Sequence, residues 1–130
     1  MYLDANFFVL ATLQEDAQGN RARMMVKEII TGKQAFTSSL AIDEVMWVFF
    51  KKQLKHEVRR VINKIYGIKN LEVKEVPASI PLRALDFMEQ YNLKPRDAFH
   101  LAIMEHFGTN EIVSDDADFD KVPNIKRIKI

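Results

Sequence analysis

Acidic residues follow two segments of this sequence that have the character of β-strands, and together they could do chemistry. Asp4 comes directly after the segment Met1–Leu3, and the ten residues Glu111–Asp120 hold five acids. Carboxylates that meet in one cleft can bind a divalent cation or transfer protons. Each acid also has an ordinary alternative, because Asp4 can cap a helix that starts at Ala5 and an acidic run can be a solvated turn.

Two further carboxylates stand where a functional side chain could lie. Glu44 falls between Ile42 and Val45, so it borders the apolar face of a predicted helix. Asp97 lies in the first turn of a helix that Pro95 opens. Each also has a plain interpretation, Glu44 as an exposed acid beside that face and Asp97 as a favourable charge near a helix N-terminus.

The elements that would position these acids alternate between strands and helices. Segments of strand character are Met1–Leu3, Ala35–Thr37, Leu71–Val76, Glu111–Val113 and Arg127–Ile130. Apolar spacing, Pro and Gly predict helices that begin at Ala5 and cover Arg21–Ile30, Ala41–Leu54, Val58–Tyr66, a stretch after Pro81, and Pro95 to Gly108. This alternation predicts an α/β sandwich around a parallel sheet, with ligands at the carboxyl ends of the strands.

Length and composition restrict the classes of protein. A chain of 130 residues predicts one domain, residues 1–130. Because there is no cysteine, disulfides, iron–sulfur clusters and thiolate metal sites are excluded, and any metal must be held by oxygen or imidazole. No apolar run approaches the ~20 residues that span a bilayer, and the N-terminus lacks the basic region of a signal peptide. We therefore expect a cytoplasmic protein with no membrane segment.

The net charge of +1 hides an uneven distribution of charge along the chain. Residues Lys51–Lys64 hold six basic side chains against the single acid Glu57, an excess of five, whereas acids gather around Asp116. A segment as basic as this can follow a phosphate backbone, although a solvated helical face is an equally good interpretation.

Four short motifs, taken together and in order, resemble those of the PIN-domain nuclease family and, within it, small VapC-type toxins. The motifs are Tyr2-Leu3-Asp4-Ala5-Asn6, Thr37-Ser38 followed by Glu44, Pro95-Arg96-Asp97-Ala98-Phe99-His100-Leu101-Ala102, and Ser114-Asp115-Asp116-Ala117-Asp118-Phe119-Asp120. In the last motif of the family a hydroxyl residue stands two positions before the acid and a Phe three positions after it. That register assigns the fourth acid to Asp116, with Asp115 and Asp118 as alternatives.

The resemblance implies a three-layer α/β/α sandwich with a central, mainly parallel sheet of about five strands. It also implies that four catalytic acids converge, namely Asp4, Glu44, Asp97 and Asp116. Asp4, Asp97 and Asp116 would bind Mg²⁺ or Mn²⁺, the hard ions that suit a carboxylate cluster, and Glu44 would act through water. The implied reaction is hydrolysis of RNA by water, which leaves a 5′-phosphate.

Supporting roles are predicted for residues near these motifs. Asn6, Ser114 and Asp118 could orient carboxylates or waters. The predicted RNA contacts are Arg96, Lys51, Lys52, Lys55 and Arg59. His100 lies one turn after Asp97 on the same helical face, where a single histidine is more often structural, and three scattered histidines do not favour a histidine-based metal site.

The resemblance further implies partners for the protein. A VapC-type toxin pairs with a cognate antitoxin and forms a homodimer. The helix Ala41–Leu54 is predicted to turn Ile42, Val45, Met46, Phe49 and Phe50 toward the core, and Leu82, Leu85 and Met88 share one face of the helix after Pro81. An exposed subset of the large apolar residues could form a dimer or antitoxin surface.

Three alternatives compete with a toxin nuclease. A housekeeping RNA-processing nuclease would use the same acids. A receiver-type phosphoacceptor needs an Asp after the third strand, but Leu71–Val76 runs into Pro77 and Ala78. The presence of all four acids argues against a non-catalytic binding module, although a short domain could occlude its own cleft or act only in a larger assembly.

Overall fold

Five short strands form one central sheet in the computed structural model, which describes residues Met1 to Ile130. The strands are β1 (Tyr2–Leu3), β2 (Ala35–Ser38), β3 (Leu71–Lys74), β4 (Glu111–Val113) and β5 (Lys126–Ile128). Their order is β3-β2-β1-β4-β5, and every neighbouring pair is parallel. The order reverses beside β1, so the carboxyl ends of β1 and β4 flank the point where such sheets bind ligands.

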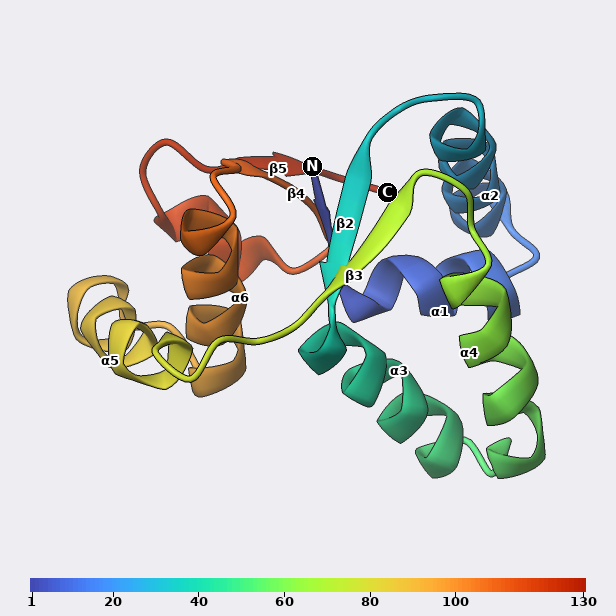
Figure 1. Ribbon diagram of the computed structural model, residues 1–130, viewed down its shortest axis with the longest axis horizontal. Helices are drawn as coiled ribbons and strands as arrows, with labels where there is room; N and C mark the ends of the chain where they lie inside the picture. The colour runs from blue at the N-terminus through green and yellow to red at the C-terminus, as the bar shows by residue number, and fades with distance from the viewer.

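Helices cover both faces of the sheet (Figure 1). The helices are α1 (Ala5–Leu13), α2 (Ala17–Ile30), α3 (Ser39–Lys51), α4 (Val58–Tyr66), α5 (Ile80–Tyr91) and α6 (Pro95–His106), with short 3-10 helices η1 (Lys55–Glu57) and η2 (Ala117–Lys121). In Figure 1, α1, α2 and α4 lie on the right, α3 lies below the sheet, and α5 and α6 lie on the left. The predicted three-layer sandwich with a five-stranded parallel sheet is confirmed.

Each face of the sheet has its own hydrophobic core, because successive side chains of a strand point to opposite faces. Leu3 and Val113 belong to the core beneath α1 to α4, whereas Tyr2 and Ile112 belong to the core beneath α5 and α6. All four side chains are completely buried. The two-residue strand β1 therefore joins both cores, and Asp4 follows it directly.

One prediction about a helix face is wrong. Met46 and Phe50 of α3 do not face the core, since they are 40% and 55% exposed. Leu82 and Leu85 of α5 are also exposed, and α5 instead buries Ile80, Ala84 and Phe87. Both helices carry apolar residues on two faces, and the sheet covers only one. No helix has both the length and the apolar character that a membrane crossing requires.

A candidate active site at the carboxyl edge of the sheet

Side chains from four separate elements meet in one cavity of about 560 Å³. The four predicted catalytic acids line it: Asp4, Glu44, Asp97 and Asp116. Asp4 follows β1, Glu44 lies on α3, Asp97 lies on α6 and Asp116 follows β4. The structure thus brings together residues that are up to 112 positions apart in the chain.

Asp4 is the most deeply placed of these acids and is only 7% exposed. Its Oδ1 accepts a hydrogen bond from Phe7 N at 3.2 Å, so it caps α1 as well as lining the cavity. Burial raises the pKa of Asp4 to about 6, although a hydrogen bond from Ser114 and the nearby His100 oppose the rise. Keeping the Asp4 carboxylate charged therefore costs free energy, which a bound cation could offset.

A second group of acids comes from α6 and from the segment after β4, and two of its members, Asp97 and Asp116, line the cavity. Asp97, Asp116 and Asp118 each offer a carboxylate oxygen, and the three oxygens lie within 4.8 Å of one another. Burial raises the pKa of Asp97, and the charge of Asp116 raises it further. Lys121 donates to Asp118 at 2.8 Å and lowers the pKa of that carboxyl. Oxygen donors at this spacing fit a hard divalent ion.

The remaining aspartates of the 115–120 run have other partners. Asp115 accepts from the side chain of Gln18 and, at 3.2 Å, from the backbone N–H of Ile130, so it ties the C-terminal segment to α2 although it also lines the cavity. Asp120 pairs with Arg127 at 2.7 Å. Asp116, by contrast, has only local hydrogen bonds. Its backbone N–H donates to Ser114 Oγ, and its Oδ1 accepts from the backbone N–H of Asp118.

Glu44 has a partner that sequence reasoning missed. Its Oε1 lies 2.6 Å from Nε2 of His100, and the other ring nitrogen of His100 lies 2.6 Å from the hydroxyl of Tyr2. Tyr2 also contacts Ser38 Oγ at 2.8 Å, and burial raises the pKa of the Tyr2 hydroxyl. The one available signal was the position of His100, one turn after Asp97 on the same face.

The predicted RNA contacts divide between two surfaces. Arg96 and Lys52 line the acidic cavity together with Asn6, and neither cation forms an ion pair with an acid. Lys55 and Arg59 line a neighbouring groove instead, and Lys51 lines neither. Two unpaired cations beside a carboxylate cluster could hold phosphates while the acids act.

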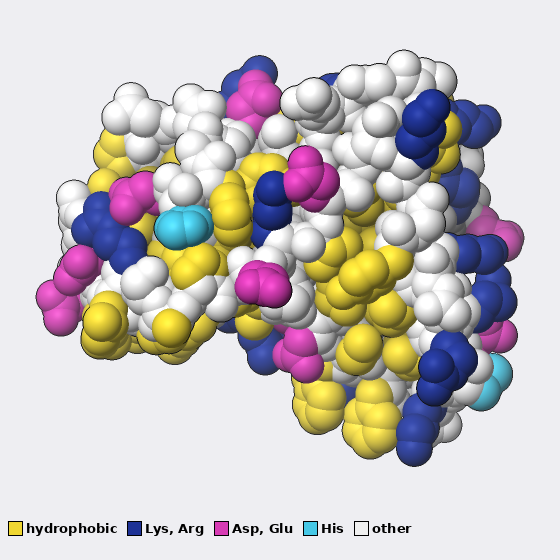
Figure 2. Space-filling view, in the orientation of Figure 1, with side chains coloured by type: hydrophobic (Ala, Val, Ile, Leu, Met, Phe, Trp, Pro, Cys, Tyr) yellow, Lys and Arg dark blue, Asp and Glu magenta, His cyan; other side chains and the backbone are white.

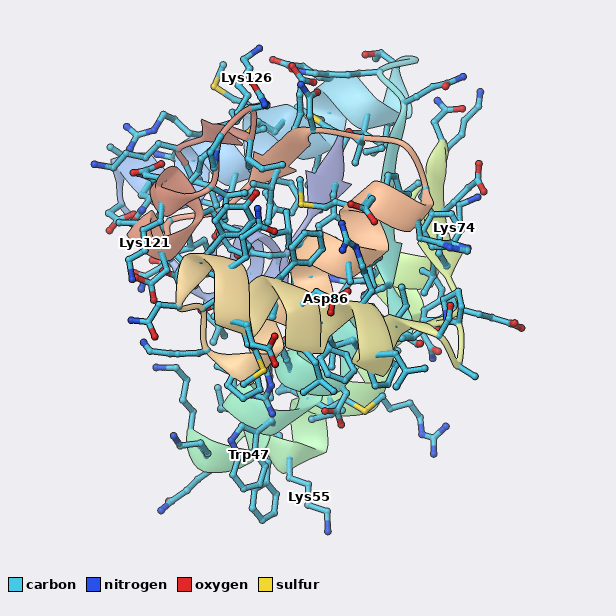
Figure 3. The ribbon with its side chains drawn as sticks, turned by 90° about the vertical axis from the view of Figure 1, so that its left-hand side faces the viewer. Trp47, Lys55, Lys74, Asp86, Lys121 and Lys126 are labelled. Atoms are coloured by element: carbon cyan, nitrogen blue, oxygen red, sulfur yellow. The ribbon has the colours of Figure 1, made fainter.

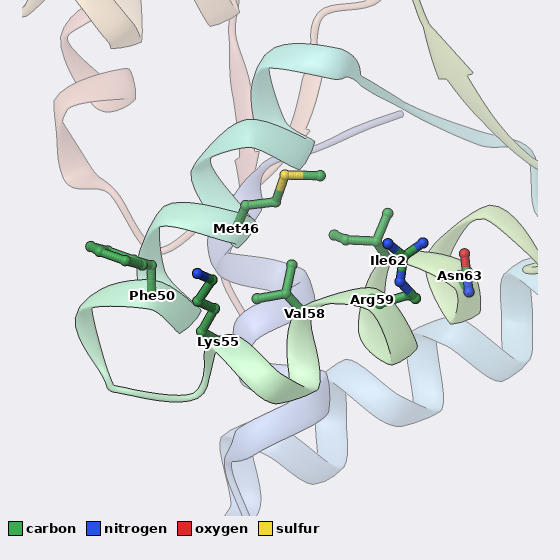
Figure 4. A pocket seen from close by; sticks show the side chains of 7 residues that line it. All are labelled: Met46, Phe50, Lys55, Val58, Arg59, Ile62 and Asn63. Carbon is green, nitrogen blue, oxygen red and sulfur yellow. The ribbon is translucent and has the colours of Figure 1, made fainter.

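The neighbouring groove lies between α3 and α4 and has a volume of about 470 Å³ (Figure 4). Its apolar lining consists of Met46, Phe50, Val58 and Ile62. In the space-filling view this region forms a hydrophobic surface bordered by Lys and Arg side chains (Figure 2). Trp47 stacks on Phe50 beside the groove, and Figure 3 shows Trp47 and Lys55 projecting from the same end of the molecule.

The fold and the site define an α/β protein whose carboxylate cavity opens at the switch point of a parallel sheet. The chain belongs to the PIN domain family, whose model matches residues 1–125. The resemblance to this family that the four motifs indicated is thereby confirmed.

Several known proteins are similar to this chain. Ribonuclease VapC13 of Mycobacterium tuberculosis and a VapC ribonuclease of Mycobacterium bovis are each 25% identical over 107 residues, which cover 82% of this chain and 81% of theirs. The crystal structure of the toxin VapC20 of M. tuberculosis, described as cleaving the sarcin–ricin loop, matches with a TM-score of 0.72 and 17% identity, covering 92% of each chain. VapBC2 of Rickettsia felis, bound to promoter DNA, matches with a TM-score of 0.74 and 15% identity, covering 98% of this chain and 96% of that one.

Proposed function

We propose that the protein is a metal-dependent endoribonuclease and the toxin component of a toxin–antitoxin pair. The observation that carries this proposal is the meeting of Asp4, Glu44, Asp97 and Asp116 in one cavity of a PIN-domain protein. The names of its relatives, which are VapC ribonucleases and toxins, support the same function. The protein would act in the cytoplasm, where RNA is available.

The donor set favours Mg²⁺ or Mn²⁺ as the cofactor. Asp97 and Asp116 are the first candidates to hold the ion because their oxygens are close together, and Asp4 would contribute from β1. Asp118 stays paired with Lys121 and would orient water. A bound divalent ion would activate water for attack on phosphorus and neutralise charge on the phosphate oxygens.

The protein's own residues would supply the rest of the reaction. Arg96 and Lys52 would bind the phosphates on either side of the scissile bond. Glu44 would orient the attacking water and accept its proton. Asn6 and Ser114 would fix the directions of the carboxylates. A hydrogen bond from Ser114, which favours the charged form of Asp4, supports this role.

Metal removal tests this function directly. After dialysis against EDTA the protein should not cleave a labelled RNA, and Mg²⁺ or Mn²⁺ should restore cleavage, because the clustered carboxylates repel the substrate when no cation is bound. The products should carry 5′-phosphates, which a 5′-phosphate-dependent exonuclease detects. Cleavage that persists in EDTA, or products with a 2′,3′-cyclic phosphate, would contradict the proposal.

We propose that the groove between α3 and α4 binds the antitoxin. Its apolar floor and its two cations, Lys55 and Arg59, suit an amphipathic helix with acidic residues along one side. The groove lies next to the cavity, since Trp47 lines the cavity and stacks on Phe50, which lines the groove. A bound helix could therefore reach the acids and block them.

A co-expression experiment tests the partner. The product of the adjacent reading frame should copurify with the protein, inhibit RNA cleavage and change the fluorescence of Trp47, the only tryptophan. Phe50→Ser should weaken this binding by roughly tenfold or more, because it removes a large apolar contact, and should leave cleavage by the isolated protein unchanged. If the purified product neither binds nor inhibits, a housekeeping RNA-processing role is favoured.

Two further expectations stay proposals. We propose that residues 1–130 form a single domain. We also propose a homodimer, for which the exposed Leu82 and Leu85 on α5 are a candidate surface.

A further inference from the structure

A buried chain of hydrogen bonds ends at the carboxylate of Glu44. It begins at Ser38 Oγ, which lies 2.8 Å from the hydroxyl of Tyr2. That hydroxyl lies 2.6 Å from Nδ1 of His100, whose Nε2 lies 2.6 Å from Oε1 of Glu44. Ser38 and Tyr2 are fully buried, whereas His100, which is 3% exposed, and Glu44 line the cavity.

The proton positions along this chain follow from its buried end. Ser38 Oγ accepts from the backbone N–H of Ala41 at 3.3 Å, and its only other partner is Tyr2. A buried hydroxyl hydrogen needs an acceptor, so Ser38 donates to Tyr2. Tyr2 must then donate to Nδ1 of His100, which leaves the ring proton on Nε2. That proton is donated to Glu44.

This arrangement assigns different tasks to the two oxygens of Glu44. Oε1 accepts the hydrogen bond from His100, whereas Oε2 has no hydrogen bond within the protein. Every fully buried side-chain oxygen or nitrogen has a partner, so Oε2 is not among the buried atoms. Because Glu44 lines the cavity, Oε2 is the carboxylate oxygen that is free to form a hydrogen bond there.

We infer that His100 is a positioning residue, which holds the Glu44 carboxylate with Oε2 directed into the cavity. The inference rests on the proposed nuclease function. Without the bond from His100, the flexible side chain of Glu44 could adopt other rotamers and its carboxylate could turn. Loss of a residue that orients a functional group commonly costs about 10- to 100-fold in activity.

Two substitutions of His100 separate positioning from packing. The amide of His100→Gln can reach the place of Nε2 and donate to Glu44, whereas the shorter amide of His100→Asn reaches only the place of Nδ1 and meets Tyr2. We expect His100→Asn to lower kcat by about 10- to 100-fold with KM nearly unchanged, and His100→Gln to retain most of the wild-type kcat. His106→Gln, an exposed position on the same helix, is the matched control.

A spectroscopic measurement tests the chain of hydrogen bonds from Ser38 to Glu44 without any variant or substrate. Long-range ¹H–¹⁵N spectra of the metal-free wild-type protein at neutral pH should show the ring proton of His100 on Nε2 and none on Nδ1. A proton on Nδ1 would overturn the inference, and so would equal kcat values for His100→Asn and His100→Gln. If the wild-type protein cleaves no RNA, the proposed function fails, whereas the spectrum still decides whether the hydrogen-bond chain exists.

Discussion

Asp116→Asn should abolish RNA cleavage, whereas Asp115→Asn, one position earlier, should leave cleavage intact. Asp116 faces the acids Asp97 and Asp118 across less than 4.8 Å, so its charge is part of the group that would bind metal. The substitution removes that charge but keeps Oδ1, which accepts from the N–H of Asp118 at 2.9 Å. We expect a loss of roughly 100-fold or more in kcat/KM, measured on a labelled RNA with Mn²⁺ present.

Asp115→Asn is the matched control because its cost should appear in stability. Asp115 accepts from Gln18 and from the backbone of Ile130, so the substitution weakens bonds that tie the C-terminal segment to α2. We expect a loss of about 1 kcal/mol in the free energy of unfolding, measured by urea denaturation. Asp116→Asn should unfold no more easily than wild type, because it relieves repulsion with Asp97. A loss of cleavage in Asp115→Asn alone would show that the fourth acid is Asp115.

Asp4→Asn should stabilise the metal-free protein at neutral pH while it removes cleavage. Burial raises the pKa of Asp4 from 3.8 to about 6, so the folded state holds this proton more tightly than the unfolded chain. The free energy of unfolding of wild type therefore contains a contribution from Asp4 that is lost as pH rises from about 4 to about 6. A shift of this size corresponds to about 3 kcal/mol, and we expect Asp4→Asn to recover about 1–2 kcal/mol of it.

The pH dependence gives this prediction its test. Urea unfolding in EDTA should show little difference between wild type and Asp4→Asn near pH 4, a growing advantage of the variant up to pH 6, and a constant advantage above pH 7. Asp4→Ala is the control, since it also removes the charge but loses the cap on Phe7 N, worth about 1 kcal/mol. An advantage that does not change with pH would show that burial does not raise this pKa.

Added metal should make wild type more stable than Asp4→Asn, the reverse of the order without metal. Mn²⁺ at 100 times its dissociation constant should stabilise wild type by about 2.7 kcal/mol, because the cation offsets the cost of the charged Asp4. Asp4→Asn should gain much less. Thermal unfolding with and without Mn²⁺ measures both.

The elements of the fold could be predicted because their signals are local. Pro95 and Gly67 mark helix ends, and strand segments such as Glu111–Val113 are short apolar runs between polar turns. The position of Asp4 directly after a strand then places this acid at the carboxyl edge of the sheet. Glu44 and Asp97 lie on helices, and their meeting with Asp4 was an expectation from the family resemblance.

The features that escaped prediction depend on contacts between distant parts of the chain. The motif register favoured Asp116 over the adjacent Asp115, but the contacts of Asp115 with Gln18 and Ile130 had no signal in the sequence. His100 gains its role from Tyr2, which is 98 positions away. Met46 and Phe50 matched the helical period of buried residues, but nothing local indicates that α4 leaves them partly uncovered.

The strand β1 has only two residues, and it has a consequence for how such a protein can be regulated. Tyr2 packs in one core and begins the contacts that lead to Glu44, Leu3 packs in the other core, and Asp4 follows at once. Removing β1 from the sheet would open both cores together, so a displacement of Asp4 that carries β1 with it is coupled to unfolding of the molecule. Occupation of the cavity is therefore the way to block the acids that leaves both cores intact.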